Sequence, residues 1–242
     1  MKIGTKSVLF GVHQFAIHPW FVAWAWWKLY GFPFDPRLWV AFFVHDLGYL
    51  GMPNMDGPEG EEHPMLGAEI MRRLFDREPY DFDWMEYSFG QHGVFFRAGR
   101  ESNFNLLLLA GWELVSIPGN FAVLKQARYH WHDFCLLHSR YYAKKLNMPF
   151  IRLCVADKLS FVLTPRWLYM LLARATGELN EYLKNAQHSE SEHWKPTGFD
   201  ANVWHAALKV YMSKWVEEHK GGKVDTWTSV DRHARDSTGV WQ

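Results

Sequence analysis

The sequence FVHDLGYLGMPNMDGPEGEEHPMLGAEIM, residues 43–71, sets an adjacent His-Asp pair in an apolar segment and reaches a third histidine after a turn rich in glycine and proline. A polar group left unsatisfied in such surroundings costs several kcal/mol, and a divalent cation satisfies imidazole and carboxylate together. Neighbouring helical residues point about 100° apart, so His45 and Asp46 can meet one ion while the second oxygen of Asp46 reaches another. The pair therefore predicts a two-metal site.

The rest of the chain predicts an all-α fold. Apolar periodicity, interrupted by proline and glycine, indicates helices over residues 18–30, 36–50, 63–75, 133–146, 150–163, 165–177, 178–186 and about 199–219. No strand-type alternation and no internal repeat is visible. The expected organisation is a core over residues 1–165 with an irregular or helical insertion at about 76–132, further helices on the same core over 166–220, and a polar tail at 221–242.

The composition excludes several classes of protein. The chain has 26 Lys and Arg against 26 Asp and Glu, which argues against bulk nucleic-acid binding. Cys135 and Cys154 lie in apolar runs and are expected to be core thiols of a cytoplasmic protein. The N-terminal residues lack the features of a signal peptide. The aromatic segment at 19–27 is too short to cross a bilayer, so it is expected to be buried in a helical core and no transmembrane segment is predicted.

Further polar residues complete a recognisable order along the chain. His18, the pair His45-Asp46, and Asp157 in CVADKL resemble the H…HD…D signature of the HD-domain superfamily of metal-dependent phosphohydrolases. HPMLGAEIM, residues 63–71, resembles the H-x-x-x-G-A helix of its two-metal members, and His138 resembles their fourth histidine. The resemblance covers about residues 15–165 and implies an HD-domain helical bundle.

The resemblance also implies a ligand set. The first ion is expected on His18, His45, Asp46 and Asp157, and the second on His63 and His138, with Asp46 bridging. The implied cofactors are two divalent ions, Mn, Fe or Co, with Mg or Zn also compatible. In this superfamily the metals polarise a phosphate oxygen and activate the water that attacks phosphorus.

One departure from the family pattern leaves the fourth histidine open. His138 follows His63 by 75 residues, whereas the stretch is usually much shorter in compact two-metal members. His92 follows His63 by 29 residues and competes for the role. We favour His138 because of its helical context, which leaves His92 in the insertion to contact substrate or transfer a proton.

Catalytic and substrate-binding candidates follow from position. The candidate catalytic residues are Asp46, Glu62 and His92. Glu62 directly precedes His63 and is the candidate general acid. Cations near the ligands or in the insertion can bind a transferred phosphoryl group; these are Arg140, Lys144, Lys158, Arg97 and Arg100.

The sequence therefore predicts a phosphohydrolase of the HD type that acts on a nucleotide or related small phosphorylated metabolite, with homo-oligomerisation left open. The same ligand set also resembles that of HD-type di-iron oxygenases, which use O₂ on small organic substrates. A third alternative is a non-catalytic, metal-binding regulatory protein. Fold and ligands alone do not separate these functions.

Overall fold

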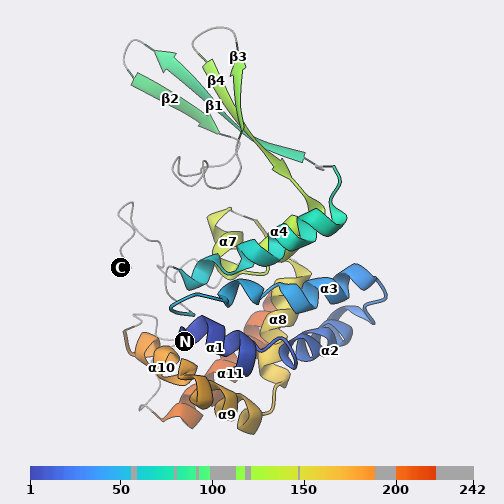
Figure 1. Ribbon diagram of the computed structural model, residues 1–242, viewed down its shortest axis with the longest axis vertical. Coiled ribbons are helices and arrows are strands. Elements are labelled where there is room, and N and C mark those ends of the chain that lie inside the picture. Colours follow the sequence, from blue (N-terminus) through green and yellow to red (C-terminus); the bar gives the residue numbers. More distant parts are fainter. Residues whose placement is uncertain are drawn as a thin grey trace.

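The computed structural model consists of a helical body from which a small β-sheet projects (Figure 1). It describes residues 1–55, 59–78, 81–90, 93–98, 113–117, 121–146, 148–188 and 200–221, with side chains described outside 81–128 and 186–188. The helical body is all-α, as the sequence predicts.

The helices of the body are mostly short. They are α1 (Ile3–Phe10), α2 (His18–Tyr30), α3 (Pro36–Val44), α4 (Pro64–Phe75), α6 (His130–Leu136), α7 (Arg140–Lys145), α8 (Arg152–Leu163), α9 (Arg166–Thr176), α10 (Glu178–His188) and α11 (Ala201–His219). Two 3₁₀ turns, η1 (Leu47–Tyr49) and η2 (Gly60–Glu62), lie between α3 and α4. None of the helices among the described residues has the length and apolar character that crossing a bilayer requires.

Local signals explain why several helices begin and end where the sequence predicts. The carboxylate of Asp35 caps α3 by accepting a hydrogen bond from the backbone N–H of Arg37 at 2.9 Å. Gly31 and Gly177 follow α2 and α9 with φ of 88°, a left-handed value that suits glycine. These residues fix the helix ends without help from the rest of the fold.

The core forms where α2 packs on α8 and α4 packs on α6. Val22, Phe42, Met71 and Leu153 are fully buried there, and each contributes roughly 1.5–3 kcal/mol by leaving water. The C-terminal helix α11 packs on α8 through the buried Trp215, so the last helices share this body. Cys135 and Cys154 are buried thiols that form no disulfide, as expected.

Two expected helices are interrupted in the structure. Residues 36–50 were expected to be continuous, but α3 ends at Val44 and Asp46 adopts φ −98° and ψ 0° outside it. Residues 133–146 contain two helices, α6 and α7, with His138 between them. Each break lies beside a histidine, His45 or His138, that belongs to the buried group of polar side chains described below. These are tertiary contacts, which the local periodicity of the sequence does not indicate.

The described part of the insertion contains a β-sheet, which corrects the expectation of an irregular or helical segment. β1 (Asp81–Gly90), β2 (Gly93–Ala98), β3 (Glu113–Ile117) and β4 (Phe121–Arg128) form an antiparallel sheet in the order β2-β1-β4-β3. Its central pairing joins Asp81 to Arg128 and Ser88 to Phe121. The pairing is distant in the sequence, so local periodicity gave no indication of it.

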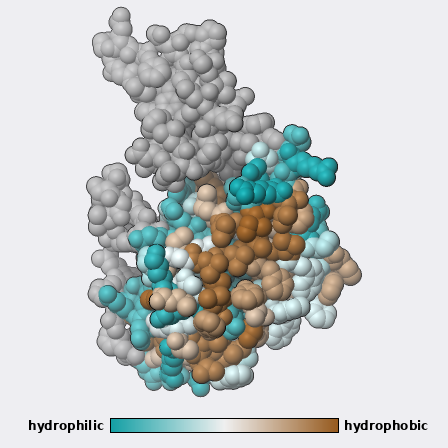
Figure 2. Space-filling model, viewed as in Figure 1, coloured by the Kyte–Doolittle hydropathy of each residue, from teal (hydrophilic) through white to brown (hydrophobic). Residues whose placement is uncertain are grey.

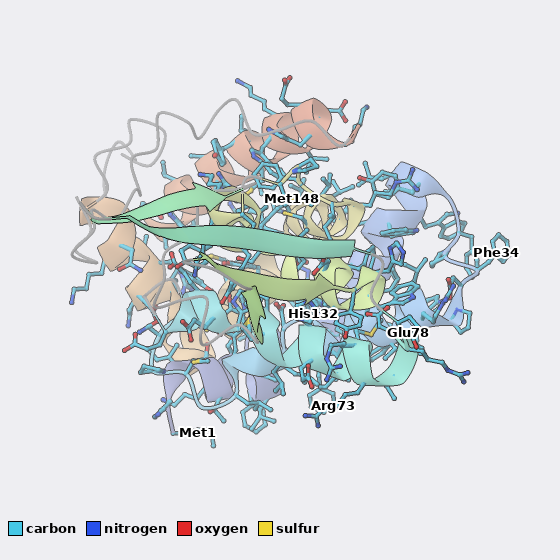
Figure 3. The ribbon with its side chains drawn as sticks, turned by 90° about the horizontal axis from the view of Figure 1, so that it is seen from above. Met1, Phe34, Arg73, Glu78, His132 and Met148 are labelled. Carbon is cyan, nitrogen blue, oxygen red and sulfur yellow. The ribbon has the colours of Figure 1, made fainter. Side chains whose placement is uncertain are left out.

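A carboxylate ties the two ends of this insertion to each other. Asp76, directly after α4, accepts hydrogen bonds from the backbone N–H groups of Trp131 and His132 at 2.9–3.1 Å. Figure 3 labels His132, which is one of these two donors, and Glu78, which follows Asp76 by two residues. In the helical body α4 therefore packs directly against α6, and the sheet is inserted between these two helices in the sequence.

The aromatic helix α2 is only partly buried, which corrects the expectation for residues 19–27. Its inner side, including Val22 and Trp26, lies in the core. Trp20, Trp24 and Trp27 are 42–58% exposed on its outer side. In Figure 2 hydrophobic residues also gather over α3 on this face of the molecule.

Candidate metal centre

Six polar side chains from separate segments converge in the helical body. They are His18 at the start of α2, His45 and Asp46 directly after α3, His63 directly before α4, His138 between α6 and α7, and Asp157 within α8. His45, Asp46, His63 and His138 are buried, and the side chains of His18 and Asp157 are only 10% and 11% exposed. Their liganding atoms form two groups that share Asp46, and each group can hold a metal ion.

The first cluster combines two imidazoles with two carboxylates. Nε2 of His18 lies 3.2 Å from Oδ2 of Asp46 and 3.2 Å from Oδ1 of Asp157. Nε2 of His45 lies 3.2 Å from the same oxygen of Asp46 and 3.9 Å from Oδ1 of Asp157. The four ligand atoms lie within 4.8 Å of one another, which is compact enough for a single ion.

The second cluster uses the other oxygen of Asp46. Oδ1 lies 3.6 Å from Nε2 of His63 and 3.4 Å from Nε2 of His138, and the two imidazole nitrogens are 3.1 Å apart. The ring of Tyr49 stacks on that of His63 with centroids 3.9 Å apart. The two oxygens of Asp46 thus face different clusters, which is the arrangement of a bridging carboxylate.

Backbone carbonyls orient three of the histidines. In each case the ring Nδ1 lies within hydrogen-bond distance of the carbonyl three residues earlier: His45 on Phe42 at 3.0 Å, His63 on Gly60 at 2.6 Å, and His138 on Cys135 at 2.5 Å. Because a carbonyl only accepts, Nδ1 carries the hydrogen, and the lone pair of a neutral ring is on Nε2. Each ring is therefore held with its metal-binding nitrogen toward the clusters.

Unsatisfied atoms test whether these residues fit a cation. Nε2 of His18, Nε2 of His45 and Oδ2 of Asp46 are buried and form no hydrogen bond, although they approach one another to 3.2 Å. A buried polar atom without a partner is costly, and one divalent ion satisfies all three. The residues fit a divalent ion with nitrogen and oxygen ligands.

The charge state of the second cluster suits metal binding. Burial and the neighbouring His138 hold the pKa of His63 well below its usual range, and burial also lowers the pKa of His138. Both rings are therefore neutral, which is the form that binds a metal. Burial opposes ionisation of Asp46, but the adjacent His45 holds the pKa of its carboxyl well below the usual range.

The first cluster carries a proton that a metal must displace. Burial alone would lower the pKa of His45, but the carboxylates of Asp46 and Asp157 raise it to about 10. Metal binding near pH 8 is therefore expected to release about one proton, and affinity is expected to rise with pH up to about 10. Calorimetric titration in two buffers of different ionisation enthalpy measures this release. Equal heats in both buffers would contradict the prediction.

One of the expected phosphate-binding cations lies at the centre. Lys158 donates a hydrogen bond from Nζ to Oδ2 of Asp157 at 2.7 Å, and this charge overcomes the effect of burial and lowers the pKa of Asp157. Arg140 is not brought to the clusters. Its guanidinium lies 5.3 Å from the ring centre of Trp215 and donates to the hydroxyl of Tyr211 at 3.3 Å, so it packs against α11.

The remaining candidates are exposed or lie beyond the described side chains. Lys144 is exposed on α7, and Glu62 is exposed at the end of η2 although the next residue, His63, is buried. His92 and Arg100 lie outside the described residues. Arg97 is a residue of β2, paired with Glu86 in the sheet, and its side chain is not described.

A hydrogen-bonded chain next to the first cluster was not predicted from the sequence. Ser7 donates to Oε2 of the fully buried Glu178 at 2.9 Å, and its Oγ lies 3.0 Å from Nδ1 of His13. The ring of His13 packs edge-on against His18 with centroids 5.6 Å apart. The spacing of His13 to His18 was visible, but Glu178 is 171 residues from Ser7 and gave no local signal.

Close backbone packing holds the His45-Asp46 turn against the segment that carries His63. A Cβ at Gly48 would overlap the carbonyl oxygen of His63 and lie 2.7 Å from its carbon. Gly48→Ala is expected to lower the free energy of unfolding by about 1–3 kcal/mol and to weaken metal binding at the second cluster. Urea unfolding and metal titration measure both effects.

Gly221→Ala serves as the matched control, because no atom of the described residues lies within 4 Å of a Cβ there. It is expected to leave both quantities unchanged. If Gly48→Ala behaves like this control, the close approach does not position His63.

Comparison of the chain with family models, curated proteins and solved structures finds no match. The helical body with its buried His/Asp clusters is compatible with an HD domain. The interpretation of the centre therefore rests on its own geometry and chemistry.

Proposed function

We propose that this protein is a two-metal phosphohydrolase of the HD type, which hydrolyses an ester or anhydride of a small phosphorylated compound. The observation that carries the proposal is the position of Asp46, whose two oxygens face separate clusters of buried ligands. Carboxylate-bridged pairs of ions are well suited to displacement at phosphorus, because both the attacking and leaving oxygens can be stabilised.

The proposed roles of the chain follow from the contacts. The first ion would be held by His18, His45, Asp46 and Asp157, and the second by Asp46, His63 and His138. Bound Mn, Fe or Co, or alternatively Mg or Zn, would supply a Lewis acid and lower the pKa of a water molecule to near neutrality. The protein's own contribution is to exclude bulk water from buried ligands and to fix three imidazoles through backbone carbonyls.

Lys158 has a separate proposed role in substrate binding. Its ammonium is held beside Asp157 by the 2.7 Å hydrogen bond, and its side chain lines the cavity next to this cluster. A fixed positive charge there favours an anionic substrate before any bond changes. The same charge keeps Asp157 ionised and available as a ligand.

Metal analysis joined to a phosphate-release assay tests the function. The protein is purified, its metal content is measured, and phosphate release is followed with Mn²⁺, Co²⁺ or Mg²⁺ over mono-, tri- and cyclic nucleotides and simple phosphate monoesters. The expected result is two ions per chain and metal-dependent release from at least one substrate class. Bound metal with no release from any phosphate compound would overturn the proposal.

A second candidate is an HD-type di-iron oxygenase, and the apolar character of the cavity beside the first cluster favours it. The same histidines and carboxylates suit iron, and an apolar cavity suits a small organic substrate. Iron-specific, redox-active spectra with O₂ consumption would support this function. Activity that persists with redox-inert Mg²⁺ or Zn²⁺ would exclude it.

A further inference from the structure

The first cluster opens onto a cavity whose other walls come from the C-terminal helices. His18, Asp157 and Lys158 line one side of it. The other sides are largely apolar and are formed by α2, α8, α9 and α11, with side chains that include Ile17, Phe21, Phe161, Leu172, Leu208 and Met212. Helices beyond the metal ligands therefore shape the space in which a substrate would lie.

The size of this cavity limits what it can take. Its volume is about 160 Å³. A cavity of roughly 150 Å³ in another protein accommodates a benzene molecule. A group of about one ring matches this space, whereas a nucleoside, with a base and a sugar, would extend beyond it.

Three hydroxyl groups in the wall already donate hydrogen bonds within the protein, which makes the wall more apolar than its composition indicates. Ser160 Oγ donates to the carbonyl of Asp157 at 2.6 Å, and Thr164 Oγ1 donates to the carbonyl of Ser160 at 2.8 Å. Tyr182 donates its hydroxyl to Glu178 at 3.4 Å. These hydroxyl hydrogens are used within the fold, so methyl groups and rings dominate what a ligand meets.

Charge is equally sparse in the cavity. Lys158 is the sole Lys or Arg among the described residues that line it, and it is bonded to Asp157. A chain of two or three phosphates carries several negative charges, which proteins usually match with several cations and oriented N–H groups. One phosphoryl group at the ions, with a neutral group in the cavity, fits this distribution better.

We propose that the substrate is a phosphate monoester whose alcohol part is a neutral, mainly apolar group of about one ring. This inference rests on the proposed function and narrows it. In the reaction, water adds to phosphorus, the ester P–O bond breaks, and the alcohol leaves with a proton from that water. The apolar group remains in the cavity between α8, α9 and α11 while inorganic phosphate is formed at the ions.

Turnover of matched esters is the first part of the test. The metal-loaded protein is assayed with phenyl phosphate, benzyl phosphate, AMP and ATP. The expected kcat/KM for phenyl phosphate and benzyl phosphate exceeds that for both nucleotides by at least about tenfold. Equal or better turnover of AMP or ATP overturns the inference but leaves the proposed function standing. The proposed function itself is overturned if phosphate is released neither from these four compounds nor from the nucleotides and monoesters of the phosphate-release assay.

Adjacent leucines on α9 supply the second part, with a binding measurement independent of turnover. Leu172 lines the cavity, whereas Leu171 is 59% exposed. Leu172→Phe is expected to weaken calorimetric binding of benzylphosphonate, which cannot be hydrolysed, by about tenfold or more, while the control Leu171→Phe leaves it unchanged. Leu172→Ala is expected to raise the relative turnover of a two-ring ester, naphthyl phosphate. Equal binding of benzylphosphonate by the wild type, Leu172→Phe and Leu171→Phe would show that the ligand lies elsewhere.

Discussion

Asp46→Asn is expected to reduce the bound metal from two ions to at most one and to lower phosphate release by at least about a thousandfold. The substitution keeps the shape of the side chain but removes the charge and one of the two liganding oxygens. Oδ2 lies 3.2 Å from the imidazoles of the first cluster and Oδ1 lies 3.4–3.6 Å from those of the second, so one cluster loses its oxygen ligand and the other keeps only a neutral amide oxygen. The loss is large because metal ions lower the pKa of bound water by roughly eight units.

Metal content by mass spectrometry and phosphate release under saturating Mn²⁺ measure these two effects. Asp35→Asn is the matched control, because it makes the same chemical change at a partly exposed helix cap where asparagine serves about as well as aspartate. It is expected to retain both ions and full activity. If Asp46→Asn retains phosphate release, the bridging role is wrong. If the variant loses the metal but still performs the protein's function in the cell, the protein is regulatory rather than catalytic.

The fold was predictable where the determinants are local. Pro36 and Asp35 mark the start of α3, and Gly31 marks the end of α2, so these boundaries were readable from the sequence. The end of α3 at Val44 was not, because it depends on tertiary contacts around the His45-Asp46 turn. The sheet was missed for a related reason, since its central pairing joins strands about 40 residues apart with no sustained alternation to reveal them.

In the candidate site, too, some residues were predictable from the sequence and others were not. The six clustered side chains were found because residue type, order and spacing together are informative, and the structure brings all of them together. Arg140 was named for its closeness to His138 in the sequence, but the aromatic ring of Trp215 on α11 draws it to another surface. The cavity and the His13–Ser7–Glu178 chain depend on C-terminal helices packing beside α1 and α2, a relation that no local pattern expresses.

Removal of metal with a chelator is expected to lower the melting temperature by about 10 °C. An ion present at a thousand times its dissociation constant stabilises the folded state by about 4 kcal/mol, and for a chain of this size each kcal/mol corresponds to about 2–4 °C. The structural reason is that Nε2 of His18, Nε2 of His45 and Oδ2 of Asp46 have no hydrogen-bond partner in the protein.

Scanning calorimetry with chelator, and again after Mn²⁺ is restored, measures the shift and its reversal. Asp46→Asn provides the control, because its melting temperature should respond weakly to either treatment if the ions are held as proposed. A wild-type melting temperature that is the same with and without chelator would mean that the polar side chains of the clusters hydrogen-bond to one another and need no metal ion. The close approach of these atoms without hydrogen-bond geometry argues against that outcome, since an internally satisfied cluster aligns its N–H groups on its oxygens.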